Sequence, residues 1–146
     1  MNIALKTLAV ASIASLALTA APALADQIKY TAALTATDET PATDSKATGT
    51  VDATYDSDTM TLTWTIEYKD LSGPVTAAHF HGPAKLGEKA DPVVPIDAPY
   101  DSPISGSMTL TDEQYSQLSQ QLWYFNLHTE KYPDGEIRGQ VVPAHP

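Results

Sequence analysis

The sequence predicts an all-β protein, an antiparallel β-sandwich of seven to eight strands with one short helix. In several short segments apolar and polar side chains alternate with a period of two, which is typical of strands with one buried face. Turn-forming residues separate these segments at nearly regular intervals, and only one segment carries the signals that start a helix. This pattern indicates strands packed in layers around one core.

The N-terminal segment is expected to be a signal peptide rather than part of the fold. Residues 7–20 are apolar apart from small hydroxyl residues, and Ala23-Leu24-Ala25 fits the small-residue pattern of signal-peptidase cleavage. The apolar run is too short, and too rich in Ala, Ser and Thr, to favour a permanent membrane anchor. We therefore expect cleavage after Ala25, one domain over residues 26–146, a periplasmic or secreted location, and no membrane attachment after cleavage.

The expected mature chain is strongly acidic. Removal of residues 1–25 takes away Lys6 and leaves 7 basic residues against 18 acidic ones, a net charge of −11. Such a surface repels nucleic acids and anionic lipids and favours cations, although solubility of an exported protein is the simplest reason for it. The chain has no cysteine, which excludes disulfides and a lipid-attachment cysteine.

The first half of the domain contains the clearest strand signals. Apolar residues from Met60 to Tyr68 alternate with Thr61, Thr63, Thr65 and Glu67, which predicts a strand with one face in the core. Weaker alternation and intervening turns predict the neighbouring strands. The expected strands cover residues 27–37, 47–55, 60–68, 75–81, 93–96, 104–110, 123–129 and 136–142.

The second half contains the long loop and the only helix. Residues 82–103 include five prolines and are irregular apart from a short edge strand, and a loop of this length in a small domain is often a binding element. Thr111 and Gln114 match a capping box, which predicts a short helix after Thr111. The aromatic residues expected in the core are Tyr30, Tyr55, Trp64, Phe80, Trp123 and Phe125.

Three histidines are candidate ligands for one metal ion. His79 and His81 lie two apart in an expected strand and therefore share the face opposite Phe80. His128 lies in another alternating segment, which a sandwich could bring alongside. Neutral imidazoles suit Cu(II) or Zn(II), so His79, His81 and His128 form our hypothetical metal site.

Two other interpretations of these residues stay open. The histidines could instead donate their N–H groups to carbonyls of the long loop and of the turn at residues 133–135, in a structural or adhesive protein. Exposed members of a tyrosine set would then be candidates for a sugar- or protein-binding platform, namely Tyr68, Tyr100, Tyr124 and Tyr132. A metal site with an open coordination position would also suit a metal-dependent redox enzyme.

Four residues near the C-terminus are expected to be structural. Glu136 and Arg138 are two apart on one strand face, which favours an ion pair over a catalytic dyad. Gly135 is expected to adopt a positive φ in its turn, and Gly139 to allow close approach of a neighbouring strand. No catalytic residues are nominated, because the sequence contains neither a recognisable Ser, His and Asp set nor a glycine-rich phosphate loop.

Two segments at opposite ends of the domain resemble the CHRD family, which is named for repeats in chordin. They are Ala78-His79-Phe80-His81-Gly82-Pro83-Ala84 and Trp123-Tyr124-Phe125-Asn126-Leu127-His128-Thr129, the latter followed by Pro133-Asp134-Gly135-Glu136-Ile137-Arg138-Gly139. The resemblance implies a Greek-key or immunoglobulin-like sandwich and no reaction. Together these observations predict an exported, non-enzymatic binding module with a metal ion, an extracellular protein or a glycan as partner.

Overall fold

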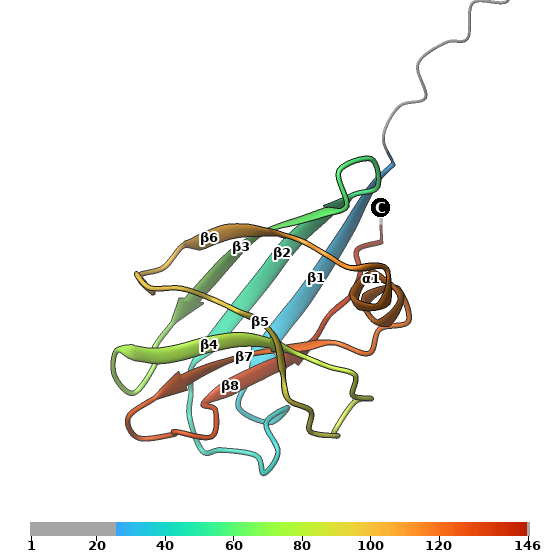
Figure 1. Cartoon of the computed structure of the whole chain (residues 1–146). Helices are drawn as coiled ribbons and strands as arrows, with labels where there is room; N and C mark the ends of the chain where they lie inside the picture. The colour runs from blue at the N-terminus through green and yellow to red at the C-terminus, as the bar shows by residue number, and fades with distance from the viewer. Residues whose placement is uncertain (1–25, 146) are drawn as a thin grey trace, which may run out of the picture.

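Residues 26–145 are described by the structure, a computed structural model, and they form nine strands and one helix (Figure 1). The predicted signal peptide, residues 1–25, lies outside the described residues. Within the described part, no helix is long and apolar enough to cross a membrane. The elements are β1 (Gln27–Thr35), β2 (Thr48–Asp56), β3 (Thr61–Lys69), β4 (Val75–His81), β5 (Pro92–Pro95), β6 (Ile104–Thr109), α1 (Asp112–Ser119), β7 (Tyr124–Thr129), β8 (Ile137–Gln140) and β9 (Val142–Pro143).

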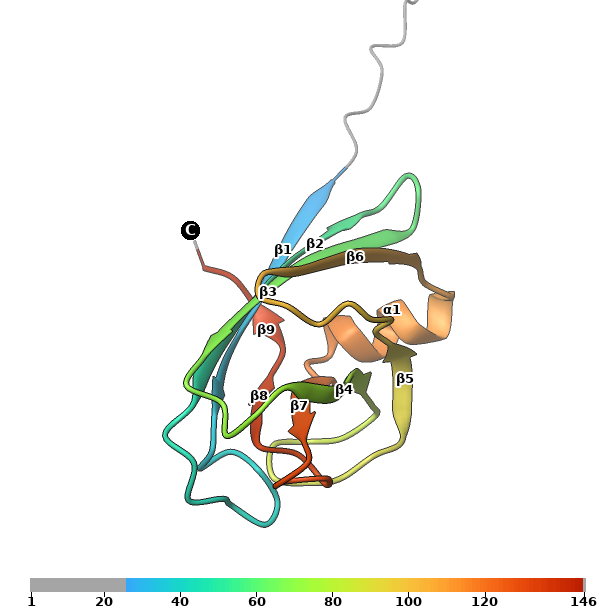
Figure 2. The same cartoon turned by 90° about the vertical axis from the view of Figure 1, so that its left-hand side faces the viewer.

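All strand pairs are antiparallel, so the prediction of an all-β antiparallel fold is confirmed. Hydrogen bonding follows the order β5-β4-β7-β8-β1-β2-β3-β6, with β9 also on β1. The two layers are joined where β1 pairs with β8 and β9, and they form one strongly curved sheet (Figure 2). The β1, β2, β3 and β6 side of this sheet faces the β4, β7 and β8 side.

The core lies between the two layers and follows the predicted alternation. In β3, Leu62, Trp64 and Ile66 are buried, and the threonines between them face outward. The rings of Trp64 from one layer and Phe80 from the other meet edge to face with centroids 5.5 Å apart. All six aromatic residues predicted to be in the core are buried.

Helix α1 lies between the layers at one end of the curved sheet (Figure 2). Thr111 accepts a hydrogen bond from the backbone N–H of Gln114, and the Gln114 side chain accepts one from the backbone N–H of Thr111. The predicted capping box is therefore present. Leu118 is fully buried, and Tyr115 stacks on Tyr55 of β2 with centroids 4.1 Å apart, so the helix closes this end of the core.

Gly139 marks a close approach between β8 and β1. A Cβ at this position would collide with the backbone carbonyl of Ala33 and lie 3.1 Å from a methyl carbon of Leu34. Backbone cannot yield as a flexible side chain does, so this crossing admits only glycine.

We predict that Gly139→Ala lowers the free energy of unfolding by about 1–3 kcal/mol, because the added methyl group overpacks the junction of the two layers. Urea denaturation of the domain measures this. Gly73→Ala is the matched control, since a Cβ there has no heavy atom within 4 Å, and its stability should stay within about 0.5 kcal/mol of the parent. Equal stability of the two variants would contradict the close approach.

Candidate metal centre

The three candidate histidines converge on one face of the β4 and β7 pair. In the antiparallel register His79 lies opposite Asn126, and Ala77 lies opposite His128. One ring nitrogen from each histidine can be chosen so that all three lie within 4.8 Å of one another. The sequence placed His79 and His81 on one face, and strand pairing brings His128 to the same place.

Backbone carbonyls fix the ring orientation of two of the histidines. Nδ1 of His81 lies 2.9 Å from the carbonyl oxygen of Ala90, in the long loop. Nδ1 of His128 lies 2.8 Å from the carbonyl oxygen of Pro133. A carbonyl only accepts hydrogen bonds, so each Nδ1 carries the hydrogen and a neutral ring keeps its lone pair on Nε2.

The third histidine contacts its neighbour directly. Nδ1 of His79 lies 3.3 Å from Nε2 of His128. His79 and His128 are half-buried, whereas His81 is buried. The cluster is therefore reachable from solvent on the side of His79 and His128 and enclosed on the side of His81.

Burial favours the neutral form of the His79 and His81 rings. It lowers the pKa of His79, and the charges that His128 and His81 would carry lower it further. Burial also lowers the pKa of His81, against hydrogen bonds to Ala90 and Asn126 that favour the charged ring. Neutral imidazole is the form that binds a metal ion.

Behind His81, two side chains form a stacked column. The ring of Tyr124 stacks on that of His81, with centroids 4.7 Å apart and planes at 2°. The guanidinium of Arg138 lies 3.4 Å from the centroid of Tyr124 and donates a hydrogen bond to the carbonyl of Glu88. Tyr124 is only 4% exposed, so it is not among the exposed tyrosines that were candidates for a binding platform.

Sequence reasoning missed two polar residues beside the histidines. Oδ1 of Asn126 lies 3.0 Å from Nε2 of His81 and 2.9 Å from Nε2 of His128. Nδ2 of Asn126 donates to a carboxylate oxygen of Glu39 at 3.4 Å. Asn126 could have been found, because it lies two residues before His128 in an alternating strand, whereas Glu39 lies in a turn that gives no such signal.

Glu39 and its surroundings are tightly packed. The side chain is 7% exposed, and burial raises its pKa, against opposing hydrogen bonds from Thr40 and Asn126 and the charges of Arg138 and Lys89. Gly135 has a φ of 129°, and a Cβ there would collide with the Glu39 carboxylate and the Asn126 amide. Gly135 thus provides the space in which this pair lies.

The expected ion pair between Glu136 and Arg138 does not form. Glu136 is fully buried and accepts hydrogen bonds from the hydroxyl groups of Ser45, Ser72 and Thr129 and from the backbone N–H of Ser72. Arg138 contacts Tyr124 and Glu88 instead. Glu136 therefore ties together three segments that are distant in the sequence.

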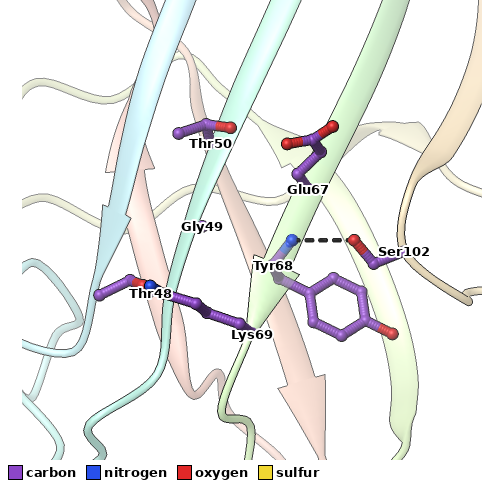
Figure 3. A pocket seen from close by; sticks show the side chains of 7 residues that line it. All are labelled: Thr48, Gly49, Thr50, Glu67, Tyr68, Lys69 and Ser102. Carbon is purple, nitrogen blue, oxygen red and sulfur yellow. Dashed lines mark hydrogen bonds between the residues drawn. The ribbon is translucent and has the colours of Figure 1, made fainter.

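A surface hollow lies elsewhere, on the outer face of β2 and β3. It measures about 450 Å³ (Figure 3). The backbone N–H of Tyr68 donates to the hydroxyl of Ser102 at 3.1 Å within it. Hydroxyl groups and single charges line it without a converging set of titratable groups, so the chemistry of the domain concentrates at the histidines.

A family model for the CHRD domain matches residues 30–141. The chain belongs to the CHRD domain family. The match includes all three clustered histidines together with Asn126, Glu39 and Glu136. Searches of curated proteins and of solved structures found no significant match.

We predict that Glu136→Gln destabilises this CHRD domain by about 1.5–3 kcal/mol at neutral pH, because hydrogen bonds to a buried carboxylate are lost. Burial alone would raise the pKa of Glu136, but the hydrogen bonds from Ser45, Ser72 and Thr129 outweigh it and lower the pKa. A lowered folded-state pKa gives stability that is present above the unfolded value and is lost as pH falls through the folded value.

Chemical denaturation between pH 7 and pH 3 measures this effect. The stability difference between the parent and Glu136→Gln should be constant near neutral pH and shrink below the ordinary glutamate value of 4.5. A difference that does not change with pH would show that the ionised carboxylate is not what these donors stabilise.

Proposed function

We propose that this CHRD domain is an exported, non-enzymatic binding module that holds one transition-metal ion, Cu(II) or Zn(II), through His79, His81 and His128. The observation that carries the proposal is the convergence of three imidazole nitrogens within 4.8 Å. Three imidazoles plus water or another donor form a set that both ions accept.

The separation of the ring nitrogens supports a mononuclear site. Two ligands at 2.0–2.1 Å from a tetrahedral ion lie about 3.3–3.4 Å apart. The distance from Nδ1 of His79 to Nε2 of His128 is 3.3 Å. Nε2 of His81 and Nε2 of His128 both lie within 3.0 Å of the same oxygen of Asn126, so they face a common point.

The hydrogen bonds from histidine Nδ1 atoms to backbone carbonyls also support metal binding. Histidines that ligate metals almost always donate the other ring N–H to a carbonyl or carboxylate, which fixes the tautomer and orients the lone pair. His81 and His128 both do so, through Ala90 and Pro133. The acidic chain adds a field that attracts cations.

We expect the mature domain, residues 26–146, to bind one equivalent of Cu(II) or Zn(II) at neutral pH, as measured by calorimetric titration and metal analysis. The triple variant His79→Ala, His81→Ala, His128→Ala should bind none, because all three imidazole ligands are gone. His145→Ala is the matched control, since this exposed histidine lies outside the cluster, and it should bind as the parent does.

The alternatives give different results in the same titration. A domain in which the histidines only organise loops would bind no more metal than the triple variant, and the variant would be markedly less stable. His79→Ala separates the effect on metal binding from the effect on folding. This half-buried ring makes no hydrogen bond to a backbone carbonyl, so its loss should weaken metal binding more than folding. Metal-dependent turnover of a redox substrate would replace the non-enzymatic proposal with an enzymatic one.

Export rests on the proposed signal peptide and on the family, since CHRD domains are typically extracellular. We expect the full chain, produced in a bacterium, to be recovered from the periplasm or medium with Asp26 as its first residue. Intact-mass measurement checks this, and recovery with residues 1–25 still attached would contradict cleavage after Ala25.

A further inference from the structure

Asn126 presents an oxygen atom where the lone pairs of two histidines meet. Its Oδ1 lies 3.0 Å from Nε2 of His81 and 2.9 Å from Nε2 of His128. The side chain is 3% exposed and comes from β7, two residues before His128. The oxygen is therefore held at the buried side of the histidine cluster.

Counting hydrogens shows that the contact between His81 and Asn126 lacks a donor when the ring is neutral. His81 and His128 each donate the Nδ1 hydrogen to a backbone carbonyl, so a neutral ring at either position presents its lone pair at Nε2. Nδ1 of His79 can donate to Nε2 of His128, whereas Nε2 of His81 faces Oδ1 of Asn126. The amide oxygen of Asn126 is also an acceptor. Nε2 of a neutral His81 and the amide oxygen of Asn126 therefore face each other as two buried acceptors, and a cation placed beside them and Nε2 of His128 would interact favourably with all three atoms.

The surroundings hold the amide in this orientation. Its Nδ2 donates to Glu39, whose other carboxylate oxygen lies 3.4 Å from the backbone nitrogen of Thr40. Glu39 itself is buried, and the absence of a side chain at Gly135 leaves room for the pair. With its nitrogen bound to a carboxylate, the amide turns its oxygen toward the histidines.

We propose that Oδ1 of Asn126 is the fourth ligand of the metal centre and that Glu39 is the residue that positions it. This inference rests on the proposed function, and it assigns three nitrogen donors and one neutral oxygen donor to the ion. The distances of 3.0 and 2.9 Å approach the spacing of about 3.3–3.4 Å between neighbouring ligands of a tetrahedral ion. The ion is then held within the side chains of this chain, and water is not required as the fourth ligand.

The composition of the chain provides a direct test. Asn126 is the only asparagine in residues 26–146, so the domain labelled with ¹³C-asparagine gives one side-chain carbonyl signal in an NMR spectrum. On titration with Zn(II), this signal should shift to a new bound position at one equivalent. A parent domain that binds Zn(II) with the signal unmoved would overturn the role of Asn126 and leave the histidine site standing.

Affinity measurements with Cu(II) and Zn(II) test the same assignment by substitution. Asn126→Ala should weaken binding by about tenfold or more, whereas Asn126→Asp, which keeps an oxygen donor and adds charge, should bind at least as tightly as the parent. Glu39→Ala should weaken binding in the same range, and Glu39→Gln should restore it, because the glutamine oxygen still accepts from the Asn126 amide.

The outcomes separate the two proposals. If the parent binds metal and Asn126→Ala binds equally well, the fourth ligand is not Asn126. If the parent binds no metal, the proposed function fails and this inference fails with it. If Asn126→Ala does not fold, the labelled parent and Asn126→Asp decide the question.

Discussion

The edge-to-face packing of Phe80 against Phe125 sets the register on which the candidate site depends. These two rings lie directly opposite each other in the β4 and β7 pair, with centroids 4.9 Å apart, and both are fully buried. A slip of one residue would expose one of these rings, so the register is strongly determined. The convergence of His79 and Asn126 on the other face therefore follows from hydrophobic packing.

The two buried carboxylates, Glu136 and Glu39, differ in how well hydrogen bonds stabilise their ionised form. Four donors surround Glu136 and hold its pKa below the ordinary value, so the ionised form is part of the fold. Glu39 receives only two long hydrogen bonds, from Thr40 and Asn126, and burial raises its pKa. The first carboxylate is therefore well satisfied within the fold, whereas the second has few hydrogen bonds to offset its burial.

Much of the fold could be predicted because it depends on periodicity and local hydrogen bonds. The alternation in β3 located its core face, and the Thr111 and Gln114 pair located the start of α1. Spacing alone could not show that Arg138 stacks on Tyr124 instead of pairing with Glu136, because this depends on how β8 lies against β7. The joining of the layers through β1 and β8 is likewise a matter of strand pairing, which periodicity does not encode.

The hydrogen bonds from Nδ1 of His81 and His128 to backbone carbonyls agree with both a structural and a metal-binding role. The surroundings of the Nε2 atoms distinguish the two roles. A histidine that only organises loops needs a donor for its second nitrogen. Nδ1 of His79 can supply one to His128, but Nε2 of His81 faces the oxygen of Asn126. An unsatisfied buried acceptor costs about 1–3 kcal/mol, and burial opposes protonation of His81 by lowering its pKa. A single cation would interact favourably with both Nε2 nitrogens and the oxygen at once, and this is the physical reason to prefer the proposed metal centre over a set of loop-organising residues.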